Sequence, residues 1–250
     1  MRALLTAAFL GGTVLWGNGC ATLHHGENRP KVIDRYQASN MQVTGKVPAD
    51  SSFNAWLAPY RDSVRQRLDR VIAQSRGAFT LEMPESTLGN LTADMIRRSA
   101  ASRLHRHIDI GITDTRLLQG IIPEGPVTAG TVYELLRTDD PIAVVCVTGR
   151  QVMRIADRVA SDGGGAISGI RMRIENRKAV DVLVGAELVQ PDSLYEIATT
   201  SSVANGVSPL LGRDKIRQRI DLDLTLREAM INYIHHRRVI VPIKDNRIRL

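Results

Sequence analysis

The stretch from residue 85 to residue 94 constrains the fold of this 250-residue chain more than any other. It reads Glu-Ser-Thr-Leu-Gly-Asn-Leu-Thr-Ala-Asp and follows a short apolar, strand-like run. Ser86 or Thr87 can accept a hydrogen bond from a free N–H of a first helical turn. Apolar residues then recur at three- and four-residue steps, which predicts a helix that ends near Ser102. Gly89 in the first turn costs about 1 kcal/mol relative to alanine, so we expect another element or a ligand to approach closely there.

The rest of the chain alternates between short apolar runs and amphipathic segments. A chain of this length can bury a sizeable core in one or two domains. The order of the segments indicates a mixed α+β domain and not a doubly wound parallel sheet. The glycine-rich segment 162–165 lacks the Lys-Ser/Thr of a phosphate-binding loop, so we expect a flexible turn. We expect strands at 108–113, 142–148, 169–175, 180–184 and 195–199, helices at 151–160 and 225–234, and a closing strand pair at 239–243 and 248–250.

Residues 1–20 have the pattern of a secretory signal. Arg2 is their only charged residue, and the apolar segment that follows is too short and too interrupted by glycine to span a bilayer. Cys20 follows a small residue, as at a bacterial lipoprotein processing site, although Gly17 stands where such sites usually carry an aliphatic residue. We therefore expect an exported bacterial protein, lipid-anchored at Cys20 in the periplasm or at the outer membrane. Cleavage to a soluble form and retention of an uncleaved anchor are the alternatives.

Two further segments precede the main domain, which we expect at 78–250. Residues 21–50 are polar with little periodicity, so we expect a tether. In the segment 51–77, apolar residues recur at helical spacing from Phe53 to Ile72, which predicts an amphipathic helix. We expect Pro59 in its first turn or at a kink. Cys146 lies within an apolar run of the main domain, and we expect it to be a core residue.

The stretch 85–94 resembles the opening signature of the C-terminal domain of 5′-nucleotidases. That family also includes 2′,3′-cyclic phosphodiesterase and UDP-sugar hydrolase relatives. The resemblance implies mixed sheets layered with helices, which agrees with the α+β pattern of the chain. In the larger relatives a linker helix between two domains occupies the place of segment 51–77. Similar segments follow in the family's order at 109–113, 125–128, 147–149, 167–171, 195–199 and 224–250, so the resemblance covers about residue 52 to the C-terminus.

The resemblance also places the family's substrate pocket at three segments of this chain. The first follows a strand, where relatives carry Asn-x-Gly-Gly-Ile-Arg. The second precedes a strand, where they carry Pro-Phe-x-Asn, and the third corresponds to Asn-Phe-x-x-x-Gly-Gly-Asp. The corresponding ligand-binding positions here are Asp114, Arg116 and Gln119, then Arg137, Thr138 and Asp140, and finally Ser202, Asn205 and Ser208.

Most of these positions carry a different side chain from the relatives. The two phenylalanines that stack on a nucleobase correspond to Thr138 and Ser202, and stacking is worth roughly 1–3 kcal/mol per base. The substrate-holding arginine corresponds to Gln119, with Arg116 nearby as a displaced guanidinium. We therefore expect a degenerate nucleotide pocket in which Arg116 or Arg137 binds a small anion.

The chain contains none of the Asp-x-His, Gly-Asp or Gly-Asn-His-Glu motifs with which metallophosphatases of this kind hold two metals. We therefore expect no catalytic residue, no metal site and no cofactor in this chain. The net charge of +7 favours an anionic ligand or surface. The arginines are spread along the chain without basic–aromatic alternation, so we do not expect a nucleic-acid partner.

Three functions remain compatible with these patterns. The first is an exported, lipid-anchored stand-alone domain that binds a small anionic ligand or a protein partner and does no chemistry itself. The second is the specificity subunit of a split 5′-nucleotidase in nucleotide catabolism, completed by a separately encoded metallophosphatase chain. The third is a structural envelope protein that uses the fold only for packing.

Overall fold

The computed structural model of the protein describes residues 40, 44–45, 49–212 and 215–250. The expected signal, its Cys20 and most of the expected tether lie outside these residues. The helices and strands fall between Asp50 and Leu250, which form one compact unit. None of the helices in the described ranges has both the length and the hydropathy that a membrane span requires.

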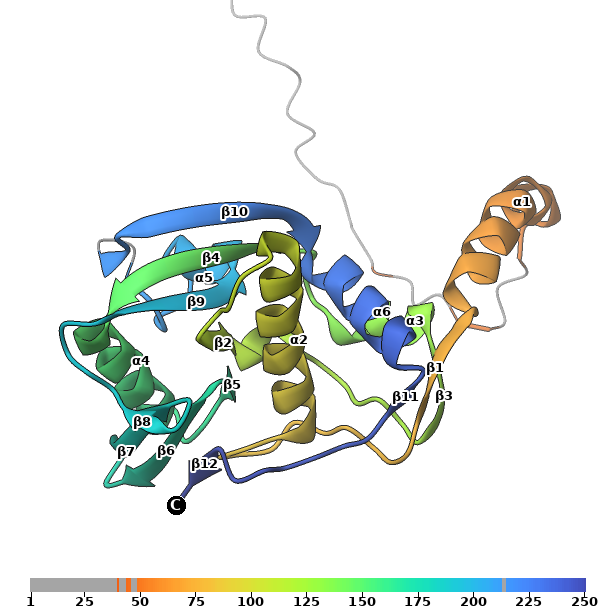
Figure 1. Ribbon diagram of the computed structural model, residues 1–250. Helices are drawn as coiled ribbons and strands as arrows, with labels where there is room; N and C mark the ends of the chain where they lie inside the picture. The colour runs from red at the N-terminus through yellow and green to blue at the C-terminus, as the bar shows by residue number, and fades with distance from the viewer. Residues whose placement is uncertain (1–39, 41–43, 46–48, 213–214) are drawn as a thin grey trace, which may run out of the picture. The chain divides into compact units, whose positions relative to one another are not determined.

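A five-stranded sheet forms the centre of this unit (Figure 1). Its order is β10-β4-β9-β2-β5, with β2 parallel to β9 and the other neighbouring pairs antiparallel. β4 carries the near-continuous apolar run that predicted a strand buried on both faces. The bounds are β2 Ile110–Thr113, β4 Pro141–Thr148, β5 Ala166–Ser168, β9 Leu194–Thr200 and β10 Gln218–Thr225.

Two smaller sheets flank the central one. The first has the order β11-β1-β3 and the second the order β12-β6-β7-β8. In each, one short strand from the C-terminal segment pairs in parallel, β11 with β1 and β12 with β6. The bounds are β1 Val71–Ser75, β3 Gly125–Thr128, β6 Ile170–Glu175, β7 Lys178–Val184, β8 Glu187–Leu188, β11 Val239–Ile240 and β12 Ile248–Arg249.

Helices complete two hydrophobic cores that meet at the central sheet. Val144 and Ala198 belong to the core that contains α2, α3, α6 and β1, whereas Val145 and Ile197 belong to the core that contains α4, β6 and β7. Successive residues of β4 and β9 therefore contribute to different cores, because their side chains alternate between the faces of the sheet. The mixed α+β fold with helices layered on sheets is thus confirmed. The helices are α1 Ser51–Leu68, α2 Thr87–Leu104, α3 Ala129–Leu135, α4 Gly149–Ser161, α5 Ser201–Ala204 and α6 Leu226–Arg237, with a 3₁₀ turn, η1, at Thr115–Leu117.

The signature stretch forms the start of α2. Ser86 is the N-cap, and its Oγ accepts a hydrogen bond of 3.0 Å from the N–H of Gly89. A Cβ added at Gly89 would lie 2.5 Å from that oxygen and 3.3 Å from the Cβ of Ala166 in β5. The glycine therefore allows a close contact within the fold.

Two polar residues of the signature stretch hold the C-terminal segment. The amide Nδ2 of Asn90 donates to Oε1 of Glu85 at 2.6 Å and to the carbonyl oxygen of Ile243 at 3.1 Å. The same Oε1 accepts a hydrogen bond of 2.9 Å from the backbone N–H of Asp245. Glu85 and Asn90 are both buried. Their role in this structure is to attach residues 241–247 to α2.

The closing strand pair expected at 239–243 and 248–250 is wrong. β11 and β12 lie in different sheets, and the segment between them crosses from one to the other. The hydrogen bonds to Glu85 and Asn90 stabilise this crossing and leave no turn at 244–246 to join the two strands. The sequence analysis also missed β10, although its apolar residues alternate strictly with polar ones.

The helix expected in segment 51–77 is shorter than predicted. α1 begins after Asp50, whose carboxylate accepts hydrogen bonds from the N–H groups of Ser52 and Phe53, and it ends at Leu68. Ile72, which has the spacing of a helical residue, is buried in β1. Pro59 lies near the middle of α1 and not in its first turn.

Candidate functional site at the strand ends

The nine expected pocket positions lie in segments that meet at one edge of the central sheet. β2 and β9 are parallel and end at this edge, whereas β4 and β5 run the opposite way and begin there. The segments that follow β2 and β9 and the segment that precedes β4 therefore meet at the same edge. Asp114 to Gln119 follow β2, Arg137 to Asp140 precede β4, and Ser202 to Ser208 follow β9.

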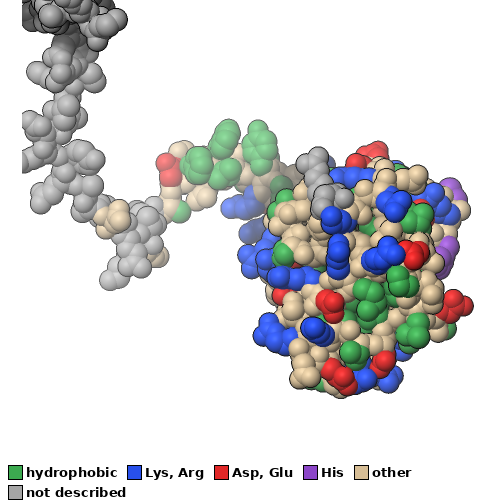
Figure 2. All heavy atoms as spheres, turned by 90° about the vertical axis from the view of Figure 1, so that its left-hand side faces the viewer, with side chains coloured by type: hydrophobic (Ala, Val, Ile, Leu, Met, Phe, Trp, Pro, Cys, Tyr) green, Lys and Arg blue, Asp and Glu red, His purple; other side chains and the backbone are tan. Residues whose placement is uncertain are grey.

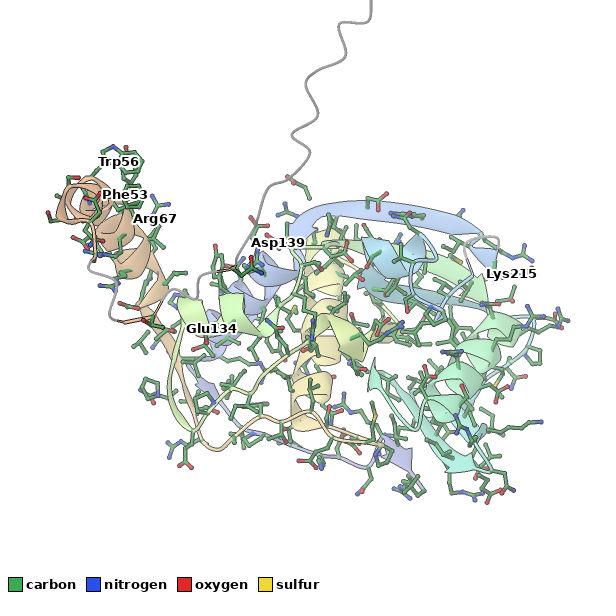
Figure 3. The ribbon with its side chains drawn as sticks, turned by 180° about the vertical axis from the view of Figure 1, so that it is seen from behind. Phe53, Trp56, Arg67, Glu134, Asp139 and Lys215 are labelled. Atoms are coloured by element: carbon green, nitrogen blue, oxygen red, sulfur yellow. The ribbon has the colours of Figure 1, made fainter. Side chains whose placement is uncertain are left out.

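Backbone hydrogen bonds join the first two segments. The N–H of Gln119 donates to the carbonyl oxygen of Leu135 at 2.9 Å, and the N–H of Arg137 donates to that of Leu117 at 3.1 Å. The side-chain amide of Gln119 donates to the carbonyl oxygen of Glu134 at 2.8 Å. Gln119, expected at the position of a substrate-holding arginine, thus instead secures α3. Figure 3 labels Glu134 on α3 and Asp139 just before β4.

A carboxylate joins the second and third segments. Oδ2 of Asp140 accepts a hydrogen bond of 3.0 Å from the N–H of Ser202 and another from its Oγ. Ser202, where the relatives carry a phenylalanine, therefore uses its hydroxyl to bond a neighbouring loop. Thr138, the position of the other phenylalanine, is exposed. Neither of these two positions therefore carries an aromatic side chain that could stack on a base.

Asp114 and Arg116 line a cleft of about 440 Å³ at the end of β2. Nε of Arg116 lies 2.9 Å from Oδ1 and 3.0 Å from Oδ2 of Asp114, so the two form a forked ion pair. Burial alone would raise the pKa of Asp114. Hydrogen bonds from Arg116 and from Ser208 more than offset that effect and hold this pKa below its usual value. Asp114 is therefore an anion at neutral pH, paired with the arginine beside it.

The last residue of β2, Thr113, also lines the cleft. Its side chain is 1 % exposed, and Oγ1 has no hydrogen-bond partner among the described residues. A buried hydroxyl without a partner loses about 1–3 kcal/mol relative to a satisfied one. A ligand atom in the cleft that accepted or donated a hydrogen bond there would recover this energy.

Two further arginines lie around the cleft, and the sequence analysis did not identify them. Arg158 of α4 donates through Nε to Oδ2 of Asp162 at 3.1 Å, and Arg177 donates to the carbonyl oxygen of Ser161. With Arg116 the lining carries three guanidinium groups against the carboxylates of Asp114 and Asp162. The local charge is therefore net positive. These arginines occur at ordinary surface spacing in the sequence, and only the fold brings them together.

The expected flexible turn at 162–165 forms one wall of the cleft and is packed. Gly164 has a φ of +140°, and a Cβ added there would lie 2.1 Å from the carbonyl oxygen of Pro84. The N–H of Gly165 donates to the same oxygen at 3.1 Å. Glycine is needed at 164 because no side chain fits between the two segments.

Seven of the nine positions lie outside the cleft lining. Arg137 and Gln119 do not line it, and Asn205 instead accepts a hydrogen bond of 2.6 Å from Arg219 of β10. Arg219 also pairs with Asp221 of the same strand. Through its bond to Asn205, Arg219 attaches β10 to the segment after β9. The cleft therefore contains Asp114 and Arg116, while the remaining positions mainly bond the loops to one another.

The described part of the chain contains no group of three or more His, Cys, Asp and Glu residues placed to bind a metal ion. Cys146 is only partly buried, in contrast to the expected core position. Partial burial and the nearby charge of Glu196 raise the pKa of its thiol. The residue is therefore protonated at neutral pH and is a poor nucleophile.

Comparisons with known proteins agree with this geometry. Residues 71–209 match the family model described as 5′-nucleotidase, C-terminal domain. The chain is 25% identical over 182 residues to a 5′-nucleotidase of Vibrio parahaemolyticus, a match that spans 68% of this chain and 31% of the relative.

Solved structures show the same fold. The 5′-nucleotidase precursor of Thermus thermophilus superposes with a TM-score of 0.69 at 22% identity, over 81% of this chain and 43% of that one. The NAD nucleotidase of Haemophilus influenzae superposes with a TM-score of 0.60 at 17% identity, over 80% and 41%. The chain thus spans less than half the length of these relatives. Because the family model matches more than half of its residues, this chain belongs to the 5′-nucleotidase C-terminal domain family.

Proposed function

We propose that this domain binds a small anion in the cleft at the end of β2 and performs no phosphatase chemistry itself. The observation that carries the proposal is that three guanidinium groups line the same cleft as Thr113, whose buried hydroxyl has no partner among the described residues. Guanidinium groups bind phosphate and carboxylate oxygens through paired N–H donors. Among the described residues, the hydrogen bond of the Arg158 guanidinium runs from Nε to Asp162, which leaves its terminal nitrogens available to a ligand.

The absence of aromatic rings at Thr138 and Ser202 supports a ligand that is not read through a nucleobase. The contact between Asp140 and Ser202 also places a carboxylate where an anion would be repelled. We therefore place the ligand beside Arg116 and Arg158, and away from the positions that stack the base in the relatives. Export and attachment of a lipid at Cys20 complete this proposal, because they would hold the domain at a bacterial membrane.

Titration with inorganic phosphate, monitored by calorimetry, tests the binding. Arg116→Ala and Thr113→Val should each weaken phosphate binding at least about tenfold without lowering the unfolding temperature by more than a few degrees. Arg137→Ala is the matched control, because this exposed arginine comes from the same edge but does not line the cleft. Equal affinity in all three variants and the wild type would refute the site, as would the absence of phosphate binding by the wild type.

A second function follows from the part of the relatives that this chain matches. The named 5′-nucleotidases extend well beyond the matched region, so phosphatase activity would require residues that this chain does not share with them. The domain would then be a specificity subunit for a separate metallophosphatase chain. Stimulation of AMP hydrolysis when the domain is added to such a phosphatase would support this function. Hydrolysis of AMP by this chain alone, with divalent ions supplied, would contradict both functions.

A further inference from the structure

α1 presents a row of large apolar side chains to solvent. Phe53, Trp56, Tyr60 and Val64 recur at three- and four-residue steps, and each is more than half exposed. No residue of α1 is buried. Figure 2 shows hydrophobic side chains gathered along this helix, and Figure 3 labels Phe53 and Trp56 on the same side of it.

The aromatic rings of neighbouring turns contact each other. The ring centroids of Phe53 and Trp56 lie 5.8 Å apart, and those of Trp56 and Tyr60 lie 5.6 Å apart. Single exposed apolar residues are ordinary, but a contiguous aromatic patch on a helix marks an interaction surface. Trp and Tyr in particular are enriched at interfaces, where one end of the ring contacts apolar groups and the other end contacts water.

Basic residues border the aromatic patch. α1 contains three arginines, Arg61, Arg65 and Arg67, against the single carboxylate of Asp62. At 100° per residue, Arg61 lies beside the apolar face and Arg67 lies in line with it at its C-terminal end, whereas Arg65 points to the other side of the helix. A helix with an aromatic face bordered by arginines matches the surface of an anionic bilayer, where rings insert at the headgroup level and cations pair with phosphates.

We propose that α1 lies in the interface of an anionic lipid membrane, with Phe53, Trp56 and Tyr60 inserted and Arg61 and Arg67 at the headgroups. The charge of the helix favours a membrane over a second copy of this chain, because two copies would bring their arginines together. Forty-nine residues precede Asp50, and they include the apolar segment that ends at Cys20. A lipid at Cys20 would concentrate α1 near the same membrane, but insertion of α1 does not require it.

Fluorescence of Trp56 tests the proposal in the full chain. Trp16→Phe leaves Trp56 as the only tryptophan, since the chain has two. On addition of vesicles that contain phosphatidylglycerol, we expect a blue shift of the Trp56 emission and quenching by brominated lipid. Because the signal arises at Trp56 itself, attachment of the chain through residues 1–20 cannot imitate it.

Charge variants separate membrane binding from nonspecific attraction. Arg61→Gln/Arg67→Gln should require about tenfold more lipid for the same shift. The double variant Arg154→Gln/Arg249→Gln removes the same charge from exposed positions outside α1 and should behave like the parent. An unchanged Trp56 emission with every vesicle would overturn the proposal. So would an emission already blue-shifted without lipid together with a doubled mass in solution, since α1 would then join two copies of the chain.

Discussion

Among the described residues, Arg247 is the most deeply buried arginine, with 9 % of its surface exposed. Its guanidinium pairs with Asp94 of α2 at 2.9 Å and with Asp245 at 2.7 Å, and it donates to the carbonyl oxygen of Ile167 in β5 at 2.8 Å. One side chain thus joins the C-terminal segment to α2 and to the central sheet.

Arg247→Met should therefore lower the free energy of unfolding by about 2–4 kcal/mol, since it leaves two carboxylates and a buried carbonyl oxygen without their partner. Urea denaturation measures the change. Arg249→Met provides the control, because Arg249 is exposed on the same strand. A loss of the same size in both variants would mean that the ion pairs contribute little.

Asp245 makes part of this stability depend on pH. Burial opposes ionisation of Asp245, but hydrogen bonds and charge from Arg247 hold its pKa below the usual value of 3.8. A carboxyl group with a lowered folded-state pKa contributes stability above its unfolded pKa and loses it as the pH falls through the folded value. The stability difference between wild type and Asp245→Asn should therefore shrink between about pH 5 and about pH 3. Urea midpoints across this range measure it, and a difference that stays constant would exclude Asp245 as the titrating group.

Some residues of the cleft could be predicted from the sequence, and others could not. Asp114 and Arg116 could be named from the segment that follows β2, and the structure brings both to the cleft. Thr113 and Arg158 could not, because a threonine at a strand end and an arginine on a helix are ordinary in any sequence. Their significance arises only where β2 and α4 end beside each other.

At the scale of elements, the signature stretch acts through its attachment to the C-terminal segment. Glu85→Ala should cost about 2–3 kcal/mol, because Asn90 and the N–H of Asp245 would lose their buried acceptor. It should also speed hydrogen exchange across residues 241–247. Glu82→Ala removes a carboxylate that pairs with Lys244 of the same segment but is exposed to solvent, so it should cost much less stability than Glu85→Ala. Similar losses of stability in the two variants would show that the buried contacts of Glu85 stabilise the domain no more than the exposed pair of Glu82 and Lys244.

The errors in the expected elements have one physical cause. Ile72 fits helical spacing after Leu68, yet β1 takes it because a strand can pair with β3 and β11 and bury it. Segment 239–250 has the pattern of a hairpin, yet each half finds a partner strand elsewhere. Local periodicity identifies which residues are apolar, whereas the available partners decide which element they join.

At the scale of the whole molecule, both hydrophobic cores include residues of β4 and β9. Because neither core can lose this sheet and remain packed, residues 50–250 should unfold in a single transition. Far-ultraviolet circular dichroism and the reactivity of the partly buried Cys146 thiol should give the same urea midpoint. Two separated midpoints would show that the cores unfold independently.

The sequence by itself determined the order of most elements, the α+β class and the family, because apolar periodicity and helix-capping residues act locally. It also predicted, through the resemblance, that Thr138 and Ser202 replace the aromatic rings of the relatives. Only the tertiary structure decided that Asp140 bonds Ser202, that the C-terminal strands separate, and that three arginines line the same cleft as Thr113. These contacts join residues far apart in the chain, and their partners are selected by burial and hydrogen bonding in the folded state.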